Sequence, residues 1–170
     1  MEKIRVEGKN GGMSDKARGN ILVAVQFALL VAIFFTPSAN SWALPFWAGL
    51  TANTLLVAGV VITGIAIFGL GKSLTANPVP KAKAVLKTGG LYAAVRHPIY
   101  SGLLLASWAF TAQHGSLWSL IAAPILTVLF AYKARFEERM LLATYPNYAA
   151  YAARVGRFVP WVGRLRGVSK

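Results

Sequence analysis

The sequence contains no cysteine and very few acidic residues. Its 170 residues include 18 lysines and arginines but only 5 aspartates and glutamates, which gives a net charge of +13. Without cysteine, the chain forms no disulfide bond, has no thiolate nucleophile and offers no cysteine ligand to a metal. A chain this basic suits either a nucleic acid or an anionic membrane surface, and the positions of the charges distinguish the two.

Charge is also missing from two long stretches of the chain. No Asp, Glu, Lys or Arg occurs in residues 19–71 or 97–132, so all 23 charged residues lie in the three remaining segments. A nucleic-acid-binding protein has no reason to confine its charge in this way, whereas a chain that crosses a bilayer must do so. With 56% hydrophobic residues, the sequence predicts an integral membrane protein and no nucleic-acid partner.

The apolar stretches divide into four runs, which predict an all-α, polytopic membrane helical bundle. The predicted spans are residues 20–35, 50–70, 98–113 and 117–132. A basic N-terminal tail precedes them (1–19), a long loop joins the second and third (71–97), and a helical segment outside the membrane follows the fourth (133–170). In the second span, Gly59 and Thr63 are small residues four positions apart, a spacing that favours close helix packing.

The basic residues predict the orientation of the bundle. Five Lys or Arg lie in residues 1–19, five in residues 71–96 and eight from Lys133 onward, while residues 36–49 and 113–116 have none. Positively charged loops stay on the cytoplasmic side of a membrane. We therefore expect both termini and the long loop to face the cytoplasm.

Residues 88–102, which read TGGLYAAVRHPIYSG, join the long loop to the third span. Pro98 suits the first turn of a helix, because its missing N–H would have no partner there in any case. Arg96 and His97 would then lie at a helix N-terminus, where backbone N–H groups favour an anionic ligand. A plainer interpretation is a basic pair and a tyrosine at the membrane border. His114 falls on the opposite side of the membrane from His97, so we expect no metal site.

The spacing G-x-Y-x-x-x-R-H-P-x-Y-x-G within this stretch resembles a signature of the integral-membrane methyltransferases, which include isoprenylcysteine carboxyl methyltransferases and phospholipid methyltransferases. Residues 137–160 resemble the second signature of the same group, EExxLxxxYxxYxxY followed by RFxP. The two matches occur in the family's order, within residues 69–161. The resemblance implies an enzyme that binds S-adenosylmethionine and methylates a lipophilic acceptor in the lipid bilayer.

The resemblance also implies roles for individual residues. Glu138 and Arg135 are the candidates for positioning or deprotonating the acceptor. Lys133 occupies the place of an arginine that contacts substrate in the isoprenylcysteine enzymes. The residues expected to bind the cofactor, several of them through the backbone, are Val85, Leu86, Lys87, Tyr92, His97, Pro98, Tyr100 and Glu137.

Other interpretations of the same residues stay open. On one helix, Lys133 with Glu137 and Arg135 with Glu138 have the spacing of ordinary surface ion pairs. A noncatalytic membrane protein of the same fold would bind a lipid or a partner protein instead. A membrane reductase of related architecture would use a nicotinamide cofactor. The acceptor's methylated group, whether carboxylate, amine or thiol, is not specified by the motifs.

Overall fold

The computed structural model describes residues 14–38, 41–71 and 86–165. Within these ranges the chain forms helices and no β-strand, which confirms the predicted all-α class. The helices are α1 (Asp15–Phe35), α2 (Phe46–Leu70), α3 (Leu91–Ala94), α4 (Pro98–His114), α5 (Leu117–Thr144) and α6 (Tyr148–Arg154).

Three of these helices, α1, α2 and α5, are long and apolar enough to cross a membrane, with 21, 25 and 28 residues. The predicted multi-pass membrane bundle is therefore confirmed. The fourth apolar run forms α4, whose 17 residues extend about 25 Å, less than the ~30 Å of a hydrocarbon core. A fourth complete crossing stays a prediction. The fourth predicted span continues as one helix to Thr144, well beyond the apolar run.

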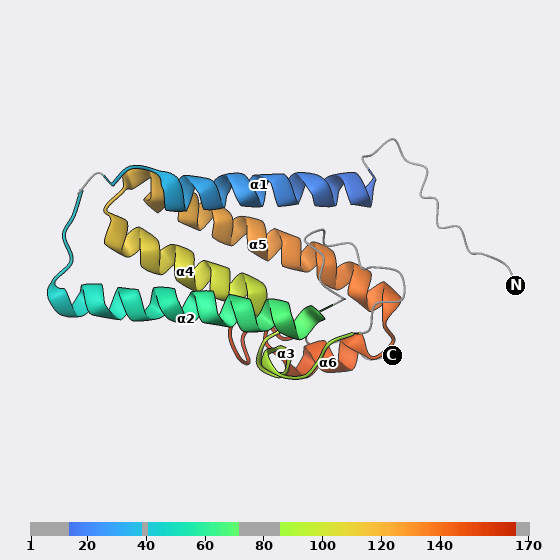
Figure 1. Cartoon of the computed structure of the whole chain (residues 1–170). Coiled ribbons are helices and arrows are strands. Elements are labelled where there is room, and N and C mark those ends of the chain that lie inside the picture. Colours follow the sequence, from blue (N-terminus) through green and yellow to red (C-terminus); the bar gives the residue numbers. More distant parts are fainter. Residues whose placement is uncertain (1–13, 39–40, 72–85, 166–170) are drawn as a thin grey trace, which may run out of the picture.

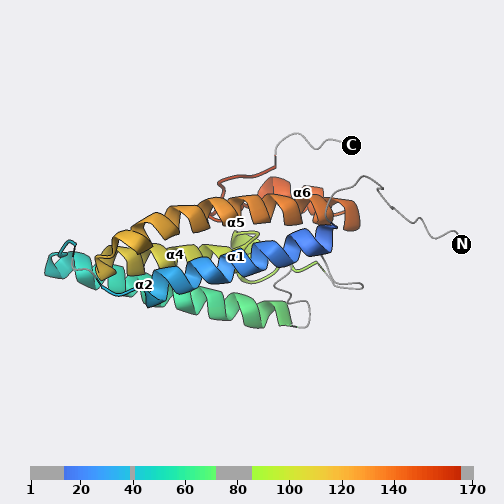
Figure 2. The same ribbon diagram turned by 90° about the horizontal axis from the view of Figure 1, so that it is seen from above.

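The long helices lie side by side, with α4 packed between α2 and α5 and with α1 against α5 (Figures 1 and 2). The contact between α2 and α4 is very close where glycines face each other. A Cβ added to Gly59 would lie 2.6 Å from the backbone N of Ala106 and 2.6 Å from the carbonyl O of Gly102. The predicted close packing at Gly59 and Thr63 is thus present, because Gly102 lies against both residues.

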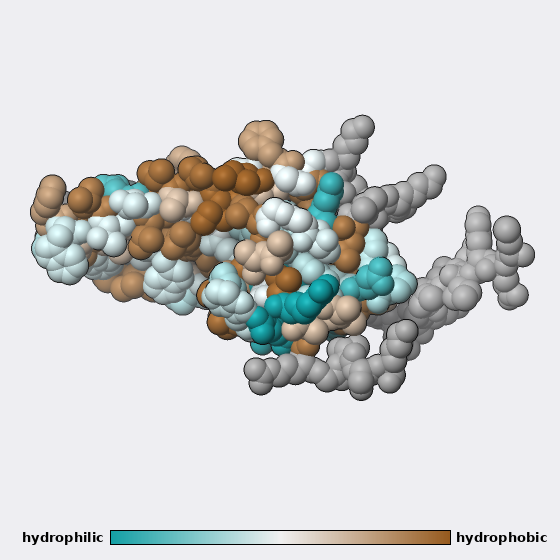
Figure 3. Space-filling model, turned by 90° about the horizontal axis from the view of Figure 1, so that it is seen from below, coloured by the Kyte–Doolittle hydropathy of each residue, from teal (hydrophilic) through white to brown (hydrophobic). Residues whose placement is uncertain are grey.

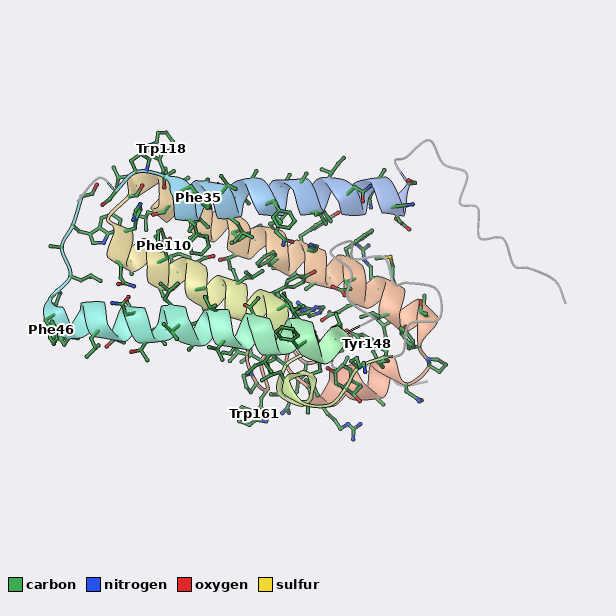
Figure 4. All side chains as sticks on the ribbon, in the orientation of Figure 1. Phe35, Phe46, Phe110, Trp118, Tyr148 and Trp161 are labelled. Atoms are coloured by element: carbon green, nitrogen blue, oxygen red, sulfur yellow. The ribbon has the colours of Figure 1, made fainter. Side chains whose placement is uncertain are left out.

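The two ends of the bundle differ in composition. At one end the uncharged connections are tied together, since Ser38 Oγ donates to the carbonyl of His114 (2.9 Å) and Trp42 Nε1 donates to that of Ala112 (2.7 Å). Phe46 and Trp118 lie at this end (Figure 4). Seen from below, hydrophobic residues dominate the half of the molecule toward this end, and hydrophilic residues gather toward the other (Figure 3). Which end faces the cytoplasm stays a prediction.

The opposite end of the bundle carries the short helices α3 and α6, beside the last turns of α2 and α5 (Figure 1). Helix α4 begins here at Pro98, which occupies its first turn as predicted. All the sequence motifs singled out above converge at this end.

Candidate functional site

The two sequence motifs meet in space through a short backbone pairing. The chain before α4 runs parallel to the chain after α6, so that Arg96 N donates to the carbonyl of Gly156 (2.8 Å) and His97 N donates to that of Arg157 (3.1 Å). The hydroxyl of Tyr151 also donates to the carbonyl of Tyr92 (2.5 Å). These bonds fix the second motif against the first, although about 60 residues separate them.

Glycine is required at two positions of the first motif. Gly90, immediately before α3, has a φ of +61°, a conformation that side chains with a Cβ rarely adopt. Gly102 in α4 lies so close to α2 that a Cβ there would come within 2.6 Å of the Gly59 carbonyl and would also meet Thr63. The last glycine of the motif is therefore required for helix packing, and this packing holds the start of α4 in place.

Glu138 is the centre of a buried charge network. One of its carboxylate oxygens accepts from Arg96 Nε and Nη2 (2.9 and 2.8 Å), and the other accepts from Arg157 Nη2 (2.7 Å). The ring Nε2 of His97 lies 3.2 Å from the first oxygen. Glu138 is only 3% exposed, and it pairs with these groups rather than with Arg135, the partner that helix spacing favours.

Arg96 extends this network to the backbone of the C-terminal segment. Its guanidinium donates to the carbonyls of Ala152 (3.0 Å) and Gly163 (2.9 Å) and also to that of Val155. A planar guanidinium with five N–H donors can satisfy a carboxylate and several carbonyls at once. Arg96 therefore serves as a cross-link between α5 and the segment after α6, and Arg157 makes a second link to Glu138. Hydrogen bonding to Glu138 raises the pKa of Arg157 further above its usual value.

A cavity of about 410 Å³ lies beside this network. Its volume is within the ~300–1,000 Å³ typical of small-molecule sites. The lining combines apolar side chains with a few polar groups: Gln26, Phe27, Leu30, Thr63, Ile67, Leu70, Tyr92, Arg96, His97, Pro98, Ile99, Tyr100, Leu103, Lys133 and Glu137. Helices α1, α2, α4 and α5 and the residues around α3 all contribute to it.

Glu137 brings a carboxylate to the wall of this cavity. Its Oε2 accepts from the Tyr100 hydroxyl at 3.3 Å and lies 3.6 Å from His97 Nδ1. The side chain of Glu137 is 27% exposed, whereas that of Glu138 is 4% exposed. Adjacent glutamates thus have different surroundings: Glu138 is enclosed by cations, while Glu137 opens toward the cavity.

Tyrosines support the same region. Tyr92 donates from its hydroxyl to the carbonyl of Ala66 in α2 (3.3 Å), and burial raises its pKa to about 12. Burial likewise raises the pKa of Tyr151 to about 12. Both hydroxyls therefore remain protonated donors at every physiological pH. Tyr148 lies near α3 and α6 (Figure 4), and it packs with Tyr151 and the partly buried Leu86.

Lys133 lines the cavity one helical turn before Glu137. It is 1% exposed, its Nζ donates to Gln26 Oε1 in α1 at 2.5 Å, and it lies 5.4 Å from the centre of the Tyr100 ring. Tyr100 itself stacks on Phe130 with ring centres 4.7 Å apart. The cavity therefore holds one cation and one anion from the same face of α5.

The structure brings most of the predicted site residues together. Tyr92, His97, Pro98, Tyr100, Lys133 and Glu137 all line the cavity. Leu86 packs against the tyrosines of α6, and Lys87 is exposed, so neither is among the described lining residues. Val85 lies outside the described residues. Arg135 is exposed and Glu138 is buried in its network; two positions along a helix from Lys133 and Glu137, Arg135 points to the other side of α5.

Gln26 and Arg157 are the residues that sequence reasoning missed. Arg157 was part of a quoted motif but had no assigned role. Gln26 had a detectable signal, since it is an amide within the apolar run 20–35, and a polar side chain inside a membrane segment usually has a functional or structural partner. Its partner, Lys133, is 107 residues away, so the pairing itself could not be found from local spacing.

The fold and the cavity define a multi-pass helical membrane protein with a small-molecule site at one end of its bundle. A model of the phospholipid methyltransferase family matches residues 46–148, more than half of the chain and most of the cavity. The chain belongs to this family of methyltransferases, and the predicted resemblance is confirmed.

Curated relatives point to the same chemistry with different acceptors. The chain is 33% identical over 128 residues to a methanethiol S-methyltransferase of Pseudomonas sp. (strain GM41(2012)), covering 72% of this chain and 46% of the relative. It is 29% identical over 165 residues to protein-S-isoprenylcysteine O-methyltransferase B of Arabidopsis thaliana, covering 89% and 82%. The cobalt-zinc-cadmium resistance protein CzcN of Cupriavidus metallidurans is 31% identical over 126 residues, covering 72% and 57%. The chain spans about half the length of the methanethiol methyltransferase.

Proposed function

We propose that this protein transfers a methyl group from S-adenosylmethionine to a lipophilic acceptor at the membrane. The observation that carries the proposal is the cavity at the junction of the two motifs, which is bounded by Glu137 and His97 and reaches between the long helices. Membership of a methyltransferase family supports the type of reaction. The named relatives act on a thiol and on isoprenylcysteine, so the relatives alone leave the acceptor open.

The residues at the Glu137 side of the cavity fit S-adenosylmethionine. The carboxylate of Glu137 is partly open to the cavity, and it suits the cofactor's ammonium or sulfonium group by charge. The aromatic ring of Tyr92 and the apolar residues Ile67 and Leu70 in the lining suit its adenosine part. When bound, S-adenosylmethionine supplies a sulfonium methyl group; the acceptor's lone pair forms the new bond to carbon while the carbon–sulfur bond breaks and leaves its pair on sulfur.

The chain's own contribution is to align the reactants and keep water away. His97 and Tyr100 hold the Glu137 carboxylate in one position, and His97 is itself fixed by the backbone bond to Arg157. Alignment of this kind can contribute a large part of a rate acceleration without any covalent catalysis. Tyr100, packed on Phe130, closes one side of the cavity with a rigid apolar surface.

Glu138 is proposed here to position these groups. Both of its oxygens are bound by cations, so it accepts no further proton readily and makes a poor base. Its bonds to Arg96 and Arg157 connect α5 to the two segments that hold His97. Arg135 is proposed to contact lipid headgroups or solvent, because it is exposed on the side of α5 away from the cavity.

The acceptor is proposed to reach the cavity from the bilayer. Phe27 and Leu30 of α1 and Ile67 of α2 line it, and α1 and α2 are not among the helix pairs in extensive contact. A lipophilic molecule can therefore approach between α1 and α2. We further propose that the end carrying the cavity faces the cytoplasm, in accord with the basic residues of that end.

The test is calorimetric binding of S-adenosylhomocysteine to the full-length protein in detergent. Wild type is compared with His97→Ala and Glu137→Ala, and Arg139→Gln serves as the control because Arg139 is an exposed residue of the same helix. The proposal expects binding by wild type and the control and at least tenfold weaker binding by the two cavity variants.

Absence of wild-type binding, in a protein whose circular dichroism shows folded helices, would refute the proposal. A titration with a nicotinamide dinucleotide then separates the two alternatives. Binding of the dinucleotide indicates a reductase, and binding of neither cofactor indicates a noncatalytic membrane protein.

A further inference from the structure

The position of Lys133 indicates which acceptors the cavity can take. This cation is 1% exposed and lies at the membrane side of the cavity, where its described hydrogen-bond partner is the neutral amide of Gln26. Gln26 is about 16 Å along α1 from Asp15 at the helix start, within an apolar run. Burying an ammonium group in such surroundings is costly unless something compensates its charge.

Gln26 compensates only part of this cost. An ammonium group has three N–H donors, while an amide oxygen carries a partial negative charge and no net charge. Placing Gln rather than Glu at this position keeps the pair positive. The pair is thus oriented by a hydrogen bond but still has the capacity to bind an anion.

Glu137 does not neutralise this end of the cavity. Its carboxylate is engaged by Tyr100 and lies beside His97. Lys133 and Glu137 are four residues apart, about 6 Å along α5, with the Tyr100 ring next to both. The two charges are therefore sorted along the cavity, the anion toward the loop end and the cation toward the membrane.

We propose that Lys133, oriented by Gln26, is an acceptor-selecting residue and that the methylated group is an anion, a thiolate or carboxylate on an apolar carrier. This inference rests on the proposed function and assigns its substrate class. It also assigns to Gln26 a positioning role that no motif gave it. Phospholipid amines, the third acceptor class that the motifs left open, are excluded by it.

The charge of Lys133 discriminates against an amine in two ways. An aliphatic amine is protonated at neutral pH, so it enters the cavity as a cation and is repelled by Lys133. Methylating a neutral amine also creates a cation that must lose a proton. A thiolate or carboxylate already has a free lone pair, and no proton has to be removed before its bond to the methyl carbon forms.

The experiment compares decanoate with decylamine, two probes with the same apolar chain and opposite charges. Binding is measured by calorimetry on the full-length protein in lipid nanodiscs at pH 7.5, with the heats for empty nanodiscs subtracted. A hydrogen bond to a charged group contributes ~1.5–3 kcal/mol, so we expect decanoate to bind about 10- to 100-fold more tightly than decylamine.

Variants then test the two residues. Gln26→Glu keeps the size of the side chain and gives Lys133 an internal counter-ion, so the preference for decanoate should disappear. Lys133→Met keeps the length of the side chain without its charge and should have the same effect. Arg139→Gln, which removes one exposed positive charge from the same helix, should leave the preference unchanged.

A wild-type preference for decylamine, or an unchanged decanoate preference in folded Gln26→Glu protein, would overturn the inference. If Lys133→Met fails to fold, the wild-type comparison and Gln26→Glu still decide. S-adenosylhomocysteine is titrated into the same nanodiscs, so that decanoate binding without it refutes the proposed function alone. Turnover with decanoate or 1-decanethiol then identifies carboxylate or thiolate as the methylated group, and methylation of decylamine only would refute both.

Discussion

Exchanging the carboxylates of Glu137 and Glu138 one at a time should produce opposite phenotypes, although the residues are neighbours on α5. Glu138 accepts hydrogen bonds from two guanidinium groups and is 3% exposed, whereas Glu137 opens to the cavity. We predict that Glu138→Gln mainly lowers stability and that Glu137→Gln mainly lowers affinity for the cofactor.

The magnitude for Glu138→Gln follows from what the substitution leaves behind. An amide keeps one carbonyl oxygen, so it cannot satisfy both Arg96 and Arg157, and its NH₂ group must face one of these donors. Removing one member of a buried ion pair costs ~3–5 kcal/mol because the remaining charge stays buried. Arg96 has a side chain only 1% exposed, which places Glu138→Gln toward the upper part of this range. The expected signs are a large loss of stability and a loosened C-terminal segment.

For Glu137→Gln the same reasoning gives a small change in stability. Its described neighbours are one tyrosine hydroxyl at 3.3 Å and one imidazole nitrogen at 3.6 Å, and a glutamine oxygen can still accept from the tyrosine. We expect a stability change below ~1 kcal/mol. The lost charge should weaken S-adenosylhomocysteine binding about tenfold or more, because hydrogen bonds to charged groups contribute ~1.5–3 kcal/mol.

The assay pairs thermal unfolding in detergent, followed by circular dichroism, with calorimetric binding on the same preparations. The reasoning is refuted if Glu138→Gln melts at the wild-type temperature, or if Glu137→Gln is destabilised as much as Glu138→Gln. Arg157→Lys is a useful third variant, since a lysine keeps the charge but cannot reproduce the two-nitrogen contact with Glu138. It should be destabilised by less than Glu138→Gln.

Three further predictions follow from other parts of the structure. Gly102→Val should destabilise the bundle by ~1–3 kcal/mol through overpacking, whereas Gly64→Ala, where an added Cβ meets nothing within 4 Å, should not; urea or thermal unfolding of both variants checks this. In spheroplasts, a membrane-impermeant maleimide should label Ser38→Cys directly and Arg154→Cys only after permeabilisation, and the reverse pattern would invert the proposed orientation. Because burial raises the pKa of Tyr151 to about 12, the folded state retains a proton that the unfolded chain loses near pH 10, so stability should fall as pH rises from 10 to 12, and less so in Tyr151→Phe.

Most of the fold could be predicted because it depends on local composition. Two stretches without charge, broken by prolines, glycines and polar turns, specify where apolar helices can form, and a membrane leaves few other backbone structures. The count of crossings is harder, because α4 and a full span differ by only a few residues. The extension of α5 to Thr144 followed from its uninterrupted helix-forming sequence.

The site was predicted in part, and the reason differs from residue to residue. Tyr92, His97 and Glu137 lie in recognisable motifs, so a resemblance could assign them to one cavity. The division of labour between Glu137 and Glu138 could not be read in this way. It depends on Arg157, which approaches Glu138 through a backbone pairing that local sequence does not encode.

The difference between these adjacent glutamates bears on how one family can serve different acceptors. The Glu138 network is enclosed and joins the two motifs, so it can remain the same whatever is methylated. Lys133 and Gln26 lie beyond it, toward the membrane, where they touch the cavity without touching the network. A substitution at Gln26 can therefore change the charge presented to an acceptor while Glu137 and His97 keep their positions. Relatives that methylate a thiol and an isoprenylcysteine would then share the cofactor end of such a cavity and differ at its membrane end.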